Sequence, residues 1–146
     1  MTVPKTFILN FMGDIMLGRL IDQMFEQHVD NDEEANIATS FLARNTNLKN
    51  YSPATPWGDT MSILHSADLN LINLETSATT HATKWPDKTF NYRMHPENAR
   101  QSLQAAKIHY AGLANNHTLD FCEPGLLETV RTMKQAGIAF AGAGET

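Results

Sequence analysis

Three apolar runs in this sequence are each followed at once by polar side chains that can bind a cation or move a proton. These polar segments are Gly13-Asp14, Asn73-Leu74-Glu75 and Asn115-Asn116-His117, with Asp120 three residues after the last. Hard divalent cations take carboxylate and amide oxygens, and an imidazole can either bind a metal or transfer a proton. If they meet in space, the segments could form a site for a divalent metal and a phosphate-like or carboxylate-like ligand.

Alternating strands and helices are the elements that would bring these segments together. Apolar runs predict strands at residues 6–12, 69–74, 108–113 and 138–141. Helical spacing of apolar residues predicts helices at residues 18–29, 59–67, 96–106 and 124–136, with polar loops at 36–56 and 76–90. This alternation favours an α/β fold with a mainly parallel sheet and helices on its faces. The carboxyl ends of parallel strands lie along one edge, where ligands usually bind.

Each polar residue also has a purely structural explanation. Asp14 directly after a strand is commonly a turn or helix-cap residue, and Asp120 could either orient His117 or cap the next turn. Asn115-Asn116-His117 is more informative, because polar side chains directly after a buried strand have no packing role there. The turn Gly142-Ala143-Gly144 is a weak phosphate-loop signal, since no helix follows it in the sequence.

The composition is that of a folded, acidic domain. The chain has 146 residues, with 11 Lys and Arg against 16 Asp and Glu, and a net charge of −5. A chain of this length can bury a core, and its charge gives no general attraction to nucleic acid or anionic lipid. The acids between Asp22 and Glu34 lack the glycine and the closing glutamate of a calcium loop, so a solvated helix end is the favoured interpretation.

Neither a membrane span nor an internal disulfide is predicted. The longest apolar runs are far shorter than the ~18 residues that a bilayer requires, and Cys122 is the single cysteine. The N-terminus lacks the apolar stretch and the cleavage site of a signal peptide. These features predict a cytoplasmic protein with no membrane span and no nucleic acid partner.

Taken together, the polar segments resemble the bacterial capsule synthesis family often called CapA, the poly-γ-glutamate synthesis domain related to calcineurin-like metallophosphoesterases. The resembling segments are Gly13 to Arg19, residues 67–75, Leu113 to Asp120 and residues 125–144. Their order and spacing match across nearly the whole chain. The resemblance implies an α/β/β/α sandwich with a site at the strand ends, of which residues 1–146 would form the first half.

The resemblance also implies roles for individual residues. Asp14, Glu75 and Asn116 would bind metal, and His117 would contact phosphate and protonate a leaving oxygen. The metal would be Mn²⁺, Fe²⁺, Zn²⁺ or Mg²⁺, and it would stabilise the charge that develops on phosphoryl oxygens. Arg19 could hold a phosphate or carboxylate through two parallel hydrogen bonds. The candidate catalytic residues are thus His117, Asp120 and Arg19.

Two departures from the family's pattern weaken the enzymatic hypothesis. Met16 stands where phosphoesterases have a second metal-binding histidine, and a thioether is a poor ligand for hard ions. The phosphoesterase relatives also supply metal histidines from later strands, whereas this sequence ends after the fourth predicted strand. We therefore expect a domain that is incomplete at its C-terminus, with an apolar sheet edge and face that a missing C-terminal half or a partner chain would cover.

Three functions are consistent with the sequence. The first is capsule or poly-γ-glutamate synthesis by a metal-dependent hydrolase or transferase that acts on an anionic polymer or a phosphate-containing small molecule. The second is a non-catalytic module that binds an anionic ligand or a partner at the same strand ends. The third, a nucleotide-binding α/β domain, is supported by fold analogy alone. Relatives in the family are typically membrane-anchored with this domain outside the cell.

Overall fold

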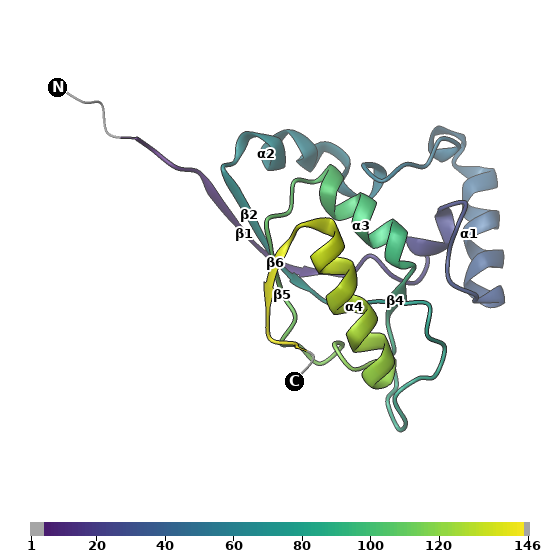
Figure 1. Ribbon diagram of the computed structural model, residues 1–146. Helices are drawn as coiled ribbons and strands as arrows, with labels where there is room; N and C mark the ends of the chain where they lie inside the picture. Colours follow the sequence, from purple (N-terminus) through teal and green to yellow (C-terminus); the bar gives the residue numbers. More distant parts are fainter. Residues whose placement is uncertain (1–4, 145–146) are drawn as a thin grey trace.

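A four-stranded parallel sheet forms the centre of the molecule. The computed structural model describes residues 5–144. The strands are β1 (Leu9–Ile15), β2 (Leu69–Leu74), β5 (Tyr110–Gly112) and β6 (Ala139–Ala141). They pair in the order β1-β2-β5-β6, and every pairing is parallel (Figure 1). The expectation of an α/β fold with a mainly parallel sheet is confirmed.

The α-helices of the described residues are α1 (Asp32–Arg44), α2 (Met61–Ser66), α3 (Pro96–Ala105) and α4 (Cys122–Ala136). Figure 1 shows α3 and α4 packed side by side over the sheet, while α1 lies to the side, away from the strands. Alternate residues of β2, namely Asn70, Ile72 and Leu74, are buried beneath the helices. The core therefore lies between this face and the pair α3 and α4.

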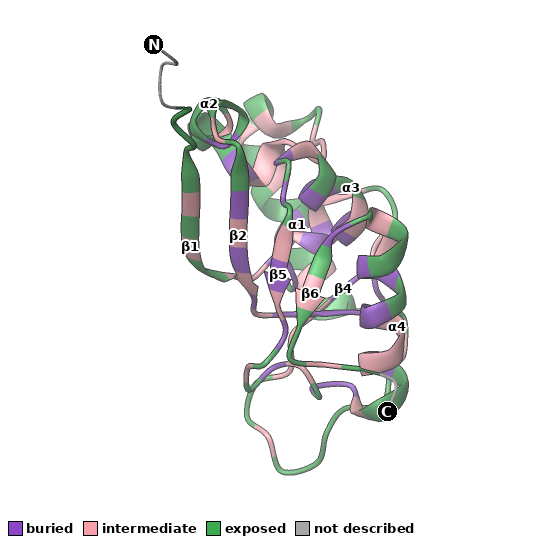
Figure 2. Cartoon of the chain, turned by 60° about the vertical axis from the view of Figure 1, so that its left-hand side comes forward, coloured by how far each residue is buried: buried purple, intermediate pink, exposed green. Residues whose placement is uncertain are grey.

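The opposite face of the sheet is open in the part of the chain that the structure describes. Leu9, Phe11 and Leu69 expose 46%, 76% and 42% of their surface on this side. In Figure 2 the strand β1, at the edge of the sheet, is exposed over most of its length. The expected uncovered edge and face are both present among the described residues.

The predicted helix at 18–29 is wrong. This segment holds only a short 3-10 turn, Asp22–Met24. The buried Asp22 carboxylate accepts hydrogen bonds from the backbone N–H of Val29, the backbone N–H of His95 and the side chain of Asn98. The contact with Val29 folds the segment back on itself, and those with His95 and Asn98 come from a distant part of the sequence, so the helical periodicity is overridden.

The helix in this part of the chain lies further on and extends into residues 36–56, where the sequence predicts a surface loop with no more than a helical turn near Phe41-Leu42. Helix α1 begins after Asn31, whose side-chain oxygen accepts a hydrogen bond from the backbone N–H of Glu34. Acidic residues fill its first turn, where their negative charges interact favourably with the positive end of the helix dipole. Only Ala38 of the helix is buried, and its large apolar residues Ile37 and Phe41 are exposed, so α1 is packed less tightly than a core helix. The acidic run is largely exposed to solvent, as expected, but it begins α1 instead of ending the predicted helix at 18–29.

The polar loop predicted at 76–90 contains a feature that the sequence did not indicate. Its start forms β3 (Ser77–Ala78), which pairs in parallel with β4 (Arg93–Met94) as a separate two-stranded sheet. These strands are too short to show a period of two. The pair fixes both ends of the intervening segment 79–92, which runs close to the strand ends of the main sheet.

Gly18 lies buried where the chain, having left β1, passes the backbone of β4. A Cβ atom at this position would lie 2.6 Å from the carbonyl oxygen of Arg93. Only glycine permits so close an approach. The exit of β1 is therefore pressed directly against the two-stranded sheet.

Within residues 5–144, no helix has both the length and the apolar character needed to cross a membrane.

Candidate functional site

The carboxyl ends of β1 and β2 bring Asp14 and Glu75 onto one shared amide. Asp14 pairs with Asn73 in the register of the two strands, after an irregularity that follows Phe11. The Asn73 side-chain nitrogen donates to Asp14 Oδ1 at 2.8 Å and to Glu75 Oε2 at 2.6 Å. Asn115, from the end of β5, donates to Asn73 Oδ1 at 2.9 Å. Three strand ends are thus joined by side-chain hydrogen bonds, and we call these residues with His117 and Asp120 the rim.

His117 stands beside this group with its two ring nitrogens facing different carboxylates. Its Nδ1 lies 2.6 Å from Asp120 Oδ2, and its Nε2 lies 3.9 Å from Glu75 Oε1. The backbone N–H of His117 donates to Asn115 Oδ1 at 2.9 Å, which fixes the turn. Asp14, Glu75 and His117, three of the four residues expected to meet, therefore lie near one another, through a 3.9 Å approach or through one intervening amide.

Asp120 is fully buried, and its carboxylate lies within hydrogen-bond distance of the His117 ring and does not cap the helix that follows. Besides the His117 ring, its carboxylate receives the backbone N–H of Tyr92 at 2.6 Å and pairs with the Lys88 ammonium. Burying a carboxylate is costly unless it is paired and hydrogen-bonded. Both oxygens of Asp120 meet that condition, so it is a fixed support for the imidazole.

Lys88 and Tyr92 are residues of the site that sequence reasoning missed. Both belong to the segment 79–92, and the Tyr92 ring stacks on the His117 ring with centroids 4.2 Å apart. Their spacing in the sequence carries no motif, because the path of an irregular segment depends on tertiary contacts. A lone lysine next to a Pro-Asp turn is the only available signal, and it is common on surfaces.

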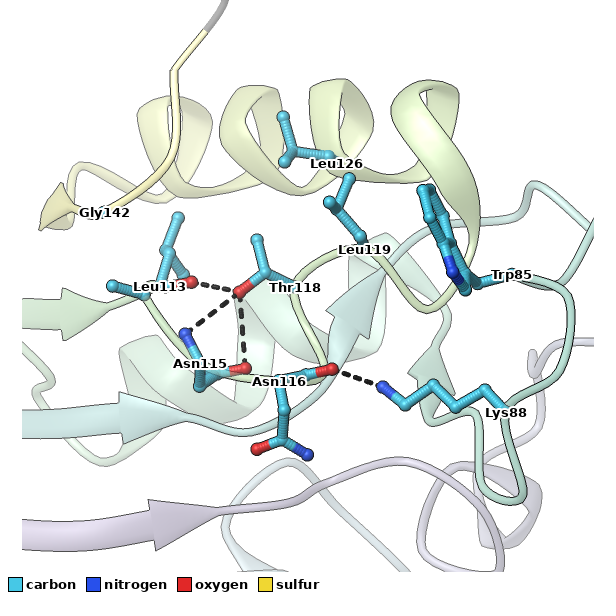
Figure 3. A pocket seen from close by; sticks show the side chains of 10 residues that line it. Trp85, Lys88, Leu113, Asn115, Asn116, Thr118, Leu119, Leu126 and Gly142 are labelled. Atoms are coloured by element: carbon cyan, nitrogen blue, oxygen red, sulfur yellow. Dashed lines mark hydrogen bonds between the residues drawn. The ribbon is translucent and has the colours of Figure 1, made fainter.

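Asn116 and Arg19, the other two predicted residues, are placed differently. Asn116 is exposed, its carbonyl oxygen accepts a hydrogen bond from Lys88, and Figure 3 shows its side chain pointing away from Leu119 and Leu126. Arg19 donates from Nε to Glu34 at 3.0 Å rather than to a carboxylate of the rim. It lines a polar cavity of about 610 Å³ that also includes Lys88 and Tyr92. Arg19 therefore neighbours the rim without joining its hydrogen-bond network.

A second cavity, of about 640 Å³, opens beside the rim. Figure 3 shows its apolar wall of Trp85, Leu119 and Leu126, with Lys88 on the polar side. Gly142 closes one end, with a φ of 94° and no room for a Cβ atom, which would lie 2.4 Å from the backbone nitrogen of Ala114. Close packing of β6 against the end of β5 therefore accounts for the glycine at position 142 without any bound phosphate.

The charges of the rim suit a cation, although its ligand set is incomplete. Asp14 and Glu75 share one amide donor, and among the described residues neither has a Lys or Arg partner within ion-pair distance. Like charges held this close repel each other, and a hard cation between them would relieve the repulsion. No group of three His, Cys, Asp or Glu residues in 5–144 converges closely enough to hold a metal ion. The rim thus offers two carboxylates and neighbouring amides.

The sequence matches one family of known proteins along most of its length. The family described as bacterial capsule synthesis protein PGA_cap matches residues 8–146. Proteins named probable polyglutamine synthesis accessory protein, from two strains of Mycobacterium tuberculosis, are 38% identical over 97% of this chain and 40% of their own length. An uncharacterized protein of Sinorhizobium fredii is 29% identical over 62% of the chain and 20% of its own. The chain spans about two fifths of the length of the mycobacterial relatives. It belongs to the bacterial capsule synthesis protein family.

Proposed function

We propose that this chain takes part in the synthesis of poly-γ-glutamate or a related capsule polymer, and that its rim carries out metal-dependent hydrolysis or transfer. Membership of the capsule synthesis family and the names of the mycobacterial relatives support the biological role. The substrate would be an anionic polymer or a phosphate-containing small molecule. Because the relatives are named accessory proteins, we also propose that the protein works beside a separate polymerising enzyme.

The observation that carries the chemical part is the pair of carboxylates joined through Asn73 and faced by His117. Asp14 and Glu75 would hold a Mn²⁺, Fe²⁺, Zn²⁺ or Mg²⁺ ion, and water or groups outside the described residues would complete the coordination. When bound, the ion would stabilise negative charge on the oxygens of the reacting group.

His117 is the residue that would move the proton. Its Nδ1 lies 2.6 Å from a carboxylate oxygen of Asp120, so Nδ1 carries a hydrogen and donates it. Nε2, on the side of Glu75, is the nitrogen that remains to exchange a proton with a leaving oxygen. The imidazole is only 9% exposed at its side chain, so the fixed carboxylate rather than bulk water determines its orientation.

The sign of the charge at the rim separates this proposal from simple anion binding. The rim residues include three carboxylates, Asp14, Glu75 and Asp120, and the neighbouring Lys88 is already paired with Asp120. A polyanion approaching this surface without a cation would be repelled.

The non-catalytic alternative, a module that binds an anionic ligand or a partner, is favoured by the absence of a three-ligand metal group in 5–144. It predicts polymer binding that a chelator leaves unchanged.

Calorimetric titration with Mn²⁺ tests the proposal at its first step. We expect binding by the unmodified chain and its loss in Asp14→Asn and in Glu75→Gln. Asp59→Asn, which removes an exposed carboxylate from the turn before α2, is the matched control and should bind as the unmodified chain does.

Hydrolysis of a generic aromatic phosphate ester in Mn²⁺ tests the second step. We expect turnover that disappears in His117→Asn and on addition of a chelator. Polyglutamate binding that is indifferent to chelator, with no turnover, would favour the binding module instead. A melting shift with ATP or NAD and none with metal would favour a nucleotide-binding domain.

A further inference from the structure

The segment between β3 and β4 closes around Asp120 from several directions. The backbone N–H of Trp85 donates to the Asp120 carbonyl at 2.8 Å, and the backbone N–H of Tyr92 donates to its Oδ2 at 2.6 Å. The Lys88 ammonium pairs with Oδ1 and also donates to the carbonyl oxygen of Asn116. The segment therefore contacts the residues on both sides of His117, namely Asn116 and Asp120.

Lys88 supplies the only ammonium or guanidinium that pairs with Asp120 among residues 5–144. Asp120 is 0% exposed. The Lys88 side chain is 23% exposed, so the charge of its ammonium is partly withdrawn from water. Its Nζ lies 3.4 Å from His117 Nδ1, which is farther than the 2.6 Å from that nitrogen to Asp120 Oδ2. An ammonium cannot accept a hydrogen bond, so the acceptor for a hydrogen on Nδ1 is the Asp120 carboxylate, whose negative charge Lys88 stabilises.

Tyr92 fixes the plane of the imidazole. Its ring centroid lies 4.2 Å from that of the His117 ring with an angle of 22° between the planes, and Phe90 also stacks on Tyr92, with centroids 6.3 Å apart. A stacked neighbour limits rotation of the ring about its last side-chain bond, whereas a hydrogen bond to Asp120 alone permits tilting. The two contacts together favour the observed orientation, with Nε2 toward Glu75.

We propose that Lys88 and Tyr92 are positioning residues for His117, acting through the charge of Asp120 and through the stacked ring. The catalytic meaning of this proposal rests on the proposed function, because His117 must transfer a proton for its orientation to affect a rate. The claim that these residues fix the orientation of the His117 ring does not rest on the proposed function, since the ring is held in place without substrate or metal. The two can therefore be tested apart.

Long-range ¹H–¹⁵N spectra of the histidine rings report which ring nitrogen carries hydrogen and whether the ring exchanges between states. In the unmodified chain we expect a single His117 pattern with hydrogen on Nδ1. Lys88→Met and Tyr92→Leu should each replace it with a mixture of tautomers or a broadened signal. Lys88→Arg and Tyr92→Phe, which keep the charge and the stacked ring, should retain the original pattern, and Lys84→Met is the control on the same segment.

Activity provides the second readout. If the phosphate ester is cleaved, Lys88→Met and Tyr92→Leu should lower kcat by about 10- to 100-fold with KM little changed, as is usual for groups that support a site residue. An unmodified His117 pattern in both variants overturns the positioning proposal. The expected ring changes in a chain that cleaves no ester would refute the proposed hydrolysis and leave the positioning intact. If Lys88→Met does not fold, Tyr92→Leu against Tyr92→Phe decides the matter.

Discussion

The carboxylates in two parts of the rim differ in whether they have cationic partners within the described residues. Asp120 is fully buried, and a lysine, a histidine and a backbone N–H satisfy it within the chain. Asp14 is exposed and Glu75 is half-buried, and the two are joined only by one amide, with no Lys or Arg partner among the described residues. The first carboxylate supports a neighbouring side chain. The second pair is arranged so that a cation from solution would complete it.

Replacing Asp120 by Ala should give the largest difference between the two parts. The change leaves Lys88 and the His117 ring without their buried partner, and we expect a loss of about 3 kcal/mol in the free energy of unfolding. Asp14→Ala should change it by no more than about 0.5 kcal/mol, because it removes an exposed charge that repels its neighbour. Urea unfolding of both variants measures the contrast. Equal losses in the two would show that the parts do not differ.

Adding Mn²⁺ should stabilise the chain through the Asp14 and Glu75 pair alone. At a free concentration 100 times the Kd, an ion that binds only the folded state adds about 2.7 kcal/mol to the free energy of unfolding. Urea unfolding with Mn²⁺ and with a chelator gives the difference directly. The gain should vanish in Glu75→Gln and persist in Lys88→Arg. A gain that survives Glu75→Gln would place the ion elsewhere.

Asn73→Asp sharpens the same contrast by changing the shared donor into a third acceptor. Without metal, the loss of two hydrogen bonds to charged groups and the added repulsion should cost about 1.5 kcal/mol. With Mn²⁺, part of this loss should be recovered, because the new carboxylate can also face the ion. Asn70, buried under the helices in the same strand, provides the control position: Asn70→Asp should destabilise the fold equally with and without Mn²⁺.

The smallest effect concerns a carboxylate outside the rim, Glu97, which is paired but exposed. Hydrogen bonds from Arg100 and Gln101 lower the pKa of Glu97 from 4.5 to about 2. Its contribution to stability is therefore complete above pH 4.5 and is lost as the pH falls toward about 2. Solvent screening limits the contribution to about 0.5 kcal/mol. Comparing Glu97→Gln with the unmodified chain by urea unfolding across this range should show the difference shrink at acid pH.

The sequence predicted the parts of the fold that are fixed by local pattern. The strand at 69–74 and the helix that starts at Pro96 match β2 and α3 because apolar periodicity and a helix-initiating proline act within a few residues. The helix at 18–29 failed because Asp22 is bound by groups from distant parts of the chain. Local pattern contains no information about such partners.

The residues of the candidate site also divide into those that local sequence pattern could place and those that it could not. Asp14, Glu75 and His117 could be brought together from the sequence, since parallel strands place their carboxyl ends along one edge. Lys88 and Tyr92 could not, because they reach His117 along an irregular segment whose ends are held by the short pair β3 and β4. Arg19, whose φ of 55° is unusual for a residue with a side chain, turns toward Glu34 instead of the rim.

The close approach at Gly18 has a consequence for any survey of mutational tolerance. Glycine has no side chain and therefore no functional group at this position. Even a methyl group would displace the segment that follows β1 from the carbonyl oxygen of Arg93, the residue after Tyr92. A saturation library selected for activity should therefore retain glycine at 18 as strictly as it retains His117. Its intolerance would reflect the spacing between the strand that delivers Asp14 and the one that anchors Tyr92.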